Sequence, residues 1–397
     1  MTSSTGAIRA HNSVITSALL CGILLIAANL RAPITALGPV LSELQQFFLL
    51  TPSALGLLNA LPLLIFACAS PMASWLTKYI SFERALFGGL VAVTVGCLLR
   101  SSGFYFGLWG GTILISCGIA VGNVLVVPLI KRDFPSHVAL CVGLYAATMA
   151  VIAALSSGLA APLSALTQYK WKLSLGIWFV VAFLAAVVWW PQLKNEHYAN
   201  KHADAQKKPS IWRSGVAWQV SMFMALHTMV FYTVIDWFPE MVKGVGIDST
   251  EAGAYLFAYQ AIAVAANLST SFLIKQMKDQ KLLGFSCSLA IVIGVAGLLL
   301  KPALAVVWLL IAGIGAGMSM VTCLTLFSLR ARDHHQASAL SGMGQCVGYG
   351  LGAVGPLLAG WMHDISGSWK APLISLAIAG CVQMFFAVMA GRSRFVS

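Results

Sequence analysis

Arg31 stands inside an apolar run over residues 14–41, and it is the residue there whose charge could do chemistry. A charged side chain within a membrane span costs about 2.5–3.5 kcal/mol on insertion scales, so such residues usually serve a function. No acid lies in the other apolar runs of the first half, and Glu43 is twelve residues further on. We expect Arg31 to face a water-filled cavity and to bind an anionic or electron-rich ligand. The alternative is a side chain that extends to the outer membrane interface.

Eight polar or aromatic side chains fall in the middle of other apolar runs, where each could contact a neighbouring helix or a ligand. Taken singly, each is more readily explained as an interhelical hydrogen bond. Together they supply few charges, several hydrogen-bond donors and aromatic walls, a combination that suits a small polar solute. These candidate substrate-binding residues, besides Arg31, are Asn123, Tyr145, His227, Tyr232, Tyr259, Gln260, Gln345 and Tyr349.

Asp236 is the carboxylate placed well inside an apolar run, shortly before Pro239. We expect it to approach Arg31 across the cavity in one conformational state and to act there in gating or coupling. A solvated acid at the outer interface is the alternative. If the pair forms, an anionic substrate competes with Asp236 for the arginine. The exchange would then shift the conformational equilibrium through the ligand's differential affinity for the two states.

The sequence gives little support for a metal site, a hydrolase site, a dinucleotide site or disulfide bonds. It contains no H-E-x-x-H and no G-x-S-x-G string, and the adjacent His334 and His335 would point in different directions on a helix. Gly350–Gly355 matches G-x-G-x-x-G, but it follows no strand and no acid lies about 20 residues on, which excludes a dinucleotide site. Nine cysteines lie in apolar stretches without a Cys-x-x-Cys pair and are expected to be free thiols. We expect no enzyme activity, metal centre or cofactor.

The composition is that of a membrane protein. Of the 397 residues, 59% are hydrophobic and 9% are charged, whereas a soluble domain has roughly 25% charged residues. The mean hydropathy of +0.86 agrees. These values exclude a soluble enzyme, a disordered chain, a coiled coil and a nucleic-acid binder.

Twelve apolar runs separated by short polar breaks can be counted along the chain. Strands of a membrane barrel would be about ten residues of alternating polarity, so the runs are predicted to be helices. The first run is expected to be an uncleaved span rather than a signal peptide. The runs are approximately 14–41, 53–76, 85–100, 106–130, 138–163, 172–190, 215–239, 252–274, 282–300, 303–329, 338–361 and 371–390.

A long polar break at residues 192–213 divides six runs from six. We predict an all-α polytopic membrane protein with a six-helix bundle over 1–191, a linker over 192–213 and a second six-helix bundle over 214–397. Most of the 24 lysines and arginines fall on the side that holds both termini and the linker. This bias predicts that side to be cytoplasmic. The net charge of +12 then reflects topology rather than nucleic-acid binding.

Glycines recur at intervals of four residues within several runs, a spacing that lets helix backbones approach closely in lipid. They predict packing or rocking surfaces at Gly107/Gly111, Gly118/Gly122, Gly313/Gly317 and Gly344/Gly348/Gly352. The string Gly118–Gly122 also resembles Gly313–Gly317, and basic residues and an aspartate follow both. The match suggests a repeat of one half in the other, which is typical of transporters that rock around a central site.

Short strings within this pattern resemble the major facilitator superfamily, in the branch that contains cyanate and 2-nitroimidazole transporters. The strings are Asn29-Leu30-Arg31 with Gly38-Pro39, Gly122-Asn123-Val124 leading to Ile130-Lys131-Arg132-Asp133-Phe134-Pro135, and Ala339-Leu340-Ser341-Gly342-Met343 followed by Gln345 and Val347-Gly348-Tyr349. The resemblance implies a monomeric secondary active transporter of the bacterial inner membrane. Its substrate would be a small anion such as cyanate or a small nitro-heteroaromatic compound, bound at Arg31 and moved by alternating access.

One loop departs from the family pattern. The loop between the second and third spans usually carries an Asp and a Gly before a basic pair, but residues 76–84 have neither, and only Glu83-Arg84 keeps the ending. The gating role usually assigned to that loop is therefore in doubt for this chain. Two alternatives to this function remain: a drug exporter of broad specificity, and a membrane sensor that does not transport.

The charge bias predicts that Asn200 is cytoplasmic and Gly246 is outside. In a cysteine-free background, a membrane-impermeant thiol reagent should label Gly246→Cys in intact cells and Asn200→Cys only after the cells are opened. Labelling of position 200 from outside intact cells would contradict this topology.

Overall fold

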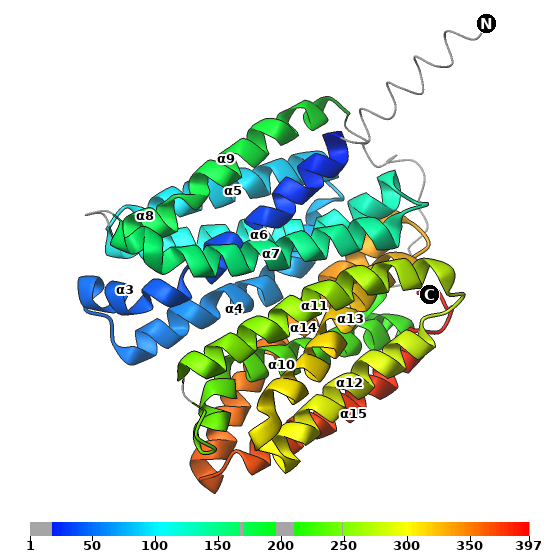
Figure 1. The fold of residues 1–397 in the computed structure, drawn as a ribbon. Helices are drawn as coiled ribbons and strands as arrows, with labels where there is room; N and C mark the ends of the chain where they lie inside the picture. The colour runs from blue at the N-terminus through cyan, green and yellow to red at the C-terminus, as the bar shows by residue number, and fades with distance from the viewer. Residues whose placement is uncertain (1–17, 167–169, 196–209, 248, 397) are drawn as a thin grey trace, which may run out of the picture.

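The computed structural model describes residues 18–166, 170–195, 210–247 and 249–396. Within these residues the chain is all-helical, as predicted, and eleven helical segments are long and apolar enough to cross a membrane. Figure 1 shows two groups of helices, one from the first half of the chain in blue to green and one from the second half in green to red. Asn200 and most of the predicted linker lie outside the described residues, and the division into domains stays a prediction.

The first group is built from long helices, and its first and sixth spans are interrupted. Residues 18–29 are helical, and the sixth predicted span is formed by two helices, α8 and α9. The labelled helices of this group are α2 (Ala32–Thr35), α3 (Leu41–Phe48), α4 (Pro52–Leu76), α5 (Phe82–Ser101), α6 (Tyr105–Asp133), α7 (Val138–Ala165), α8 (Trp171–Gly176) and α9 (Trp178–Trp189).

The second group has six long helices that follow one another with short connections. They are α10 (Gly215–Lys243), α11 (Ser249–Gln276), α12 (Lys281–Leu300), α13 (Ala305–Leu329), α14 (His334–Ser366) and α15 (Lys370–Ala390). Together with the first group they account for the twelve predicted spans. We call the end of the molecule that carries Ala18 and Val396 the terminus end.

Helix α14 is the span that hydropathy alone finds hardest to detect. It has 33 residues, yet it is not among the eleven segments that are apolar enough to be recognised by composition. The reason is its buried face, which carries Ser338, Ser341, Gln345 and Tyr349. These side chains face other helices rather than lipid, so the helix can be polar and still cross the membrane.

At the terminus end, two helices begin at a residue whose side chain caps the first turn. Ser81 accepts a hydrogen bond from the backbone N–H of Arg84 at 3.3 Å and begins α5. Asp333 accepts one from Gln336 at 2.8 Å and begins α14. Each cap satisfies one of the N–H groups that a helix leaves without a partner in its first turn.

Glycines bring pairs of helices into close contact. A methyl group added at Gly118 of α6 would lie 2.4 Å from the carbonyl oxygen of Gly89 in α5, and one at Gly317 of α13 would lie 2.0 Å from that of Ala263 in α11. Neither position has room for a side chain. The predicted packing role of these two glycines is therefore confirmed.

The predicted alignment of the two halves places Gly313 in the position of Gly118, but the contacts place Gly315 there, two residues further along the chain. Gly315, not Gly313, makes the contact that corresponds to Gly118: a methyl group there would lie 2.6 Å from the carbonyl oxygen of Cys287 in α12. Gly313 instead faces Tyr259 of α11. Sequence strings could be matched at either offset, and only the face that each glycine presents decides between them.

Gly118→Ala should lower the thermal stability of the purified protein, by about 1–3 kcal/mol in unfolding free energy, because the methyl group would force α5 and α6 apart. Gly110→Ala is the matched control on the same helix, since Gly110 is exposed and a methyl group there meets no atom within 4 Å. Thermal unfolding in detergent measures both variants. Equal melting temperatures for the two would contradict the packing.

Candidate functional site

The first membrane span is broken at Leu30 and Arg31. Helical structure ends at residue 29, Leu30 and Arg31 form a turn, and α2 begins at Ala32. Pro33 follows two residues after Arg31 and has no N–H to donate to the carbonyl of Asn29, so a continuous helix would lose a hydrogen bond there. Interrupted membrane helices expose backbone groups and often surround binding sites. The break places Arg31 at a point where its side chain leaves the helix line.

Arg31 contacts the second half of the molecule. Its Nη1 donates a hydrogen bond to the hydroxyl of Tyr232 in α10 at 3.0 Å. The phenol groups of Tyr145 in α7 and Tyr349 in α14 also interact with the guanidinium group. In the described part of the chain no ion pair involves Arg31. The cation is therefore surrounded by neutral hydroxyl groups.

Asp236 does not pair with Arg31 in this structure. It lies one turn further along α10 than Tyr232, and its side chain is exposed. A phenol can accept a hydrogen bond from the guanidinium group without a second charge having to leave water, which removes one desolvation cost. The pairing of Arg31 with Asp236 stays a prediction for another conformation.

A buried polar cluster next to this contact is centred on Asn123 of α6. Its Oδ1 accepts a hydrogen bond from the hydroxyl of Tyr145 at 3.4 Å, and its Nδ2 donates to the hydroxyl of Tyr349 at 3.4 Å. Gln345 donates from Nε2 to the backbone oxygen of Asn123 at 3.5 Å, while its Oε1 has no hydrogen-bond partner within the described segments. These bonds are long, so a ligand could replace them at little cost.

Aromatic rings from both halves pack beside this cluster. Phe231 contacts the rings of His227, Tyr232 and Tyr259, with centroids 5.6–6.0 Å apart. The ring of Phe66 in α4 lies 5.0 Å from that of Tyr349. His227 is buried, and its Nδ1 has no hydrogen-bond partner in the described part of the chain.

Eight of the nine predicted binding residues thus lie in one connected set. Arg31, Asn123, Tyr145, Tyr232, Gln345 and Tyr349 are joined by hydrogen bonds or electrostatic contact, and His227 and Tyr259 join them through Phe231. Gln260 is half-buried on α11, and no described hydrogen bond connects it to this set. Phe66 and Phe231 were missed, because a phenylalanine in an apolar span gives no sequence signal.

The described contacts between the two halves lie at this cluster or nearer the terminus end. The ammonium group of Lys131 in α6 donates to the carbonyl oxygens of Ser328 and Ala331, where α13 ends. The hydroxyl groups of Ser74 in α4 and Ser338 in α14 are 3.5 Å apart. The ring of Phe82 contacts that of His334 at 5.7 Å. The halves are therefore packed together at the terminus end.

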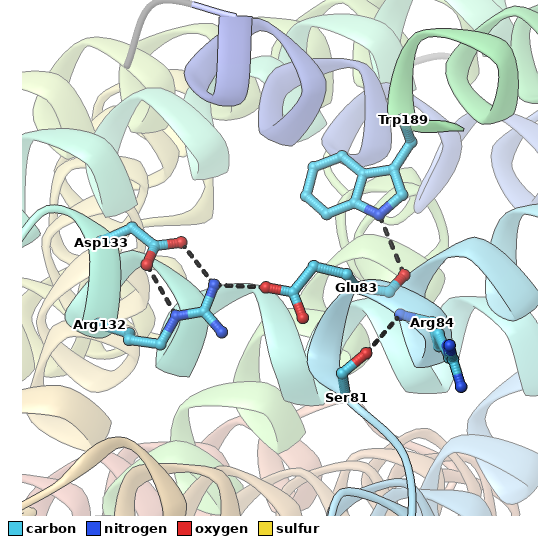
Figure 2. A network of polar contacts seen from close by, with 6 residues as sticks. All are labelled: Ser81, Glu83, Arg84, Arg132, Asp133 and Trp189. Carbon is cyan, nitrogen blue, oxygen red and sulfur yellow. Dashed lines mark hydrogen bonds and ion pairs between the residues drawn. The ribbon is translucent and has the colours of Figure 1, made fainter. Parts of the chain in front are cut away.

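Each half also carries an arginine that joins its own helices at the terminus end. Figure 2 shows the arginine of the first half, Arg132, which contacts the carboxylate of Glu83 at 2.6 Å and the carboxylate of Asp133 at 2.7 Å. The indole N–H of Trp189 donates to the backbone oxygen of Glu83 at 3.1 Å. These contacts tie α5, α6 and α9 together. The retained Glu83 of the unusual loop is thus a buried structural partner of Arg132.

Arg330 takes the corresponding place in the second half. It donates to the carbonyl oxygens of Ala390 at 2.8 Å and Gly391 at 2.9 Å, and to the side chain of Gln280. Gln280 just before α12 stands where Glu83 stands at the start of α5. The repeat of the two halves therefore extends to the arginine contacts, with a carboxylate in one half and an amide in the other.

Comparisons with known proteins agree with this architecture. The sequence profile described as "Major Facilitator Superfamily" matches residues 19–353. A protein of Escherichia coli K12 named "2-nitroimidazole transporter" is 39% identical over 377 residues, covering 95% of this chain and 96% of that protein. The "Cyanate transport protein CynX" of the same organism is 26% identical over 360 residues, covering 88% and 91%. The solved structure of the proton:xylose symporter XylE has the same fold, with a TM-score of 0.78 at 13% identity over 94% of this chain and 95% of that chain.

The contact between Ser74 and Ser338 predicts that the double variant Ser74→Cys with Ser338→Cys forms a disulfide under mild oxidation in a cysteine-free background. With a protease site inserted in the predicted linker, cleavage should leave the two halves joined until a reductant is added. Each single variant is the control and should separate into two fragments. Separation of the oxidised double variant would contradict the packing at the terminus end.

Proposed function

Because this chain belongs to the major facilitator superfamily, we propose that it is a secondary active transporter for a small anion of the cyanate type or a small nitro-heteroaromatic compound. It is a multi-pass membrane protein, and we place it in the bacterial inner membrane with both termini in the cytoplasm. The names of the two E. coli relatives support this substrate class.

The observation that carries the proposal is the guanidinium group of Arg31, held among phenol hydroxyls with no carboxylate partner among the described residues. A guanidinium group binds two oxygens of a planar anion or of a nitro group through parallel N–H donors. The neighbouring Asn123 and Gln345 supply further polar groups for the rest of a small ligand. Phe66 and Phe231 supply flat apolar walls on which a heteroaromatic ring can stack.

The position of this site suggests how binding is linked to conformational change. Arg31 belongs to the first half and Tyr232 to the second, so a ligand that enters between them contacts both halves. A ligand shifts a conformational equilibrium only by its differential affinity for the two states. We propose that residues 1–191 and 214–397 move as units around this site, and that Asp236 acts as a competing partner of Arg31 in another state.

The aromatic walls favour one alternative, an exporter that accepts a broad range of compounds. Four rings, those of Phe66, Phe231, Tyr259 and Tyr349, lie around the polar cluster. Such an exporter would depend on these rings and not on Arg31. A sensor that binds but does not transport differs from both, because purified protein in proteoliposomes would show binding without flux.

Arg31→Ala should still fold, since it removes a charge that is costly within a membrane span, but it should lose at least tenfold in substrate affinity. Arg31→Lys should recover only part of the affinity, because lysine lacks the planar fork. A thermal-shift panel of cyanate, nitrate, bicarbonate, carboxylates and nitroimidazoles measures this; a ligand at 100 times its Kd stabilises the folded state by about 2.7 kcal/mol.

Arg332→Ala is the matched control, since Arg332 is exposed at the terminus end. It should keep the ligand response of the parent. Uptake into proteoliposomes should follow the same order as the thermal shifts. Unchanged binding and uptake in Arg31→Ala would overturn the assignment, and sensitivity only to changes in the aromatic walls would favour the exporter.

A further inference from the structure

Two hollows on the outside of the second half lie along the same pair of helices. One is an apolar groove of about 550 Å³, lined by Leu299 of α12 and by residues of α15 from Ile374 to Phe385. The other has a volume of about 530 Å³ and lies at the terminus end, where Asp279, Lys281, Val388, Arg392, Ser393 and Arg394 line it. Helices α12 and α15 lie side by side in Figure 1, in yellow and red.

Helical register shows that the two hollows share one face. Ile374, Ile378, Cys381 and Phe385 of the groove recur at intervals of three and four residues, and Val388 of the second hollow continues this stripe on α15. On α12, Lys281 and Leu299 are separated by about five helical turns and so point in the same direction. The apolar groove therefore leads into the charged hollow.

The charged hollow carries a surplus of positive charge. Lys281 pairs with Asp279 at 2.8 Å, and the hydrogen bond from Lys281 keeps the pKa of Asp279 below its ordinary value. These two charges therefore offset each other. The guanidinium groups of Arg392 and Arg394 make no described hydrogen bond or ion pair, so both are available to an anion.

The surroundings are those of a membrane surface. Both helices are membrane spans, and the charged hollow lies where α12 begins and α15 ends. Large apolar side chains project outward beside it: Leu282 is 65% exposed, Phe385 57% and Phe395 56%. Basic side chains above exposed apolar ones match the layering of a phospholipid, with its phosphate at the surface and its acyl chains below.

We infer that this face binds one anionic phospholipid, with the phosphate at Arg392 and Arg394 and an acyl chain in the groove beside Cys381 and Phe385. A phosphate accepts charge-assisted hydrogen bonds from two guanidinium groups. The anionic headgroup matters because a zwitterionic lipid would bring its own cation next to the arginines. This site is separate from Arg31 and does not depend on the proposed substrate.

Native mass spectrometry of the whole protein, titrated with phosphatidylglycerol or with phosphatidylethanolamine of the same acyl chains, tests this inference. The parent should retain one phosphatidylglycerol at a lipid concentration at least tenfold below that needed for phosphatidylethanolamine. The double variant Arg392→Gln with Arg394→Gln should lose this preference. The matched control, Lys301→Gln with Lys370→Gln, removes two exposed lysines at the opposite ends of the same helices and should keep it.

A second variant separates the groove from the charges. Cys381→Trp places a large ring on the exposed face of α15 and should weaken both lipids about equally. Glycerol 1-phosphate, which has the phosphate without acyl chains, should not displace the lipid at equal concentration. Displacement by it would show a site for free phosphate and overturn the lipid assignment.

Three further results would also overturn it: equal retention of the two lipids by the parent, unchanged preference in the arginine variant, or a dimer that is lost in Cys381→Trp. The last would show that a second copy of the chain covers this face. The parent comparison needs no variant, so the inference can fail even if a substituted protein does not fold.

Discussion

A guanidinium group within a membrane span must find its hydrogen-bond acceptors inside the protein, and much of the central structure follows from this constraint. Arg31 lies at a break in its helix, where Pro33 prevents the backbone from continuing. Its acceptor is a hydroxyl group from the other half of the chain, Tyr232. The spans of the first half offer no acid, and the hydrogen-bond acceptor of the cation comes from the second half. The two halves are therefore joined at the centre by a polar contact rather than by apolar packing alone.

The terminus end satisfies its charges by a different route. There Arg132 and Arg330 each join helices of their own half, whereas Lys131 crosses to the carbonyl oxygens at the end of α13. A helix end carries partial negative charge on its last carbonyl groups, which a lysine can neutralise. Arg132 and Arg330 each use several fixed donors within one half, whereas Lys131 reaches the other half with one ammonium group. The Lys131 contact thus has fewer hydrogen bonds to break than either arginine contact.

The twelve spans and their order could be predicted from the sequence, because lipid requires backbone hydrogen bonds to be satisfied within each span. The composition of the central cluster could also be predicted, since polar residues in apolar spans are few. The partner of Arg31 could not. Tyr232 and Asp236 are four residues apart on α10 and share a side of that helix, so the sequence alone does not choose between them. The register of the repeat failed for a related reason, because Gly313 and Gly315 lie in one string but face different helices.

The identity of that partner has a consequence for the proposed transport cycle. With a carboxylate as its partner, an empty site would be neutral, and closing it would cost little. With a phenol, the empty site keeps one uncompensated positive charge, and enclosing it away from water is expensive. A monoanionic substrate at the proposed site would neutralise the charge and remove most of that cost, so the loaded site would close more readily than the empty one. In the proposed cycle the contact of Arg31 with Tyr232 would therefore favour movement of the loaded transporter. A substrate that brings no negative charge or electron-rich group would not gain this advantage.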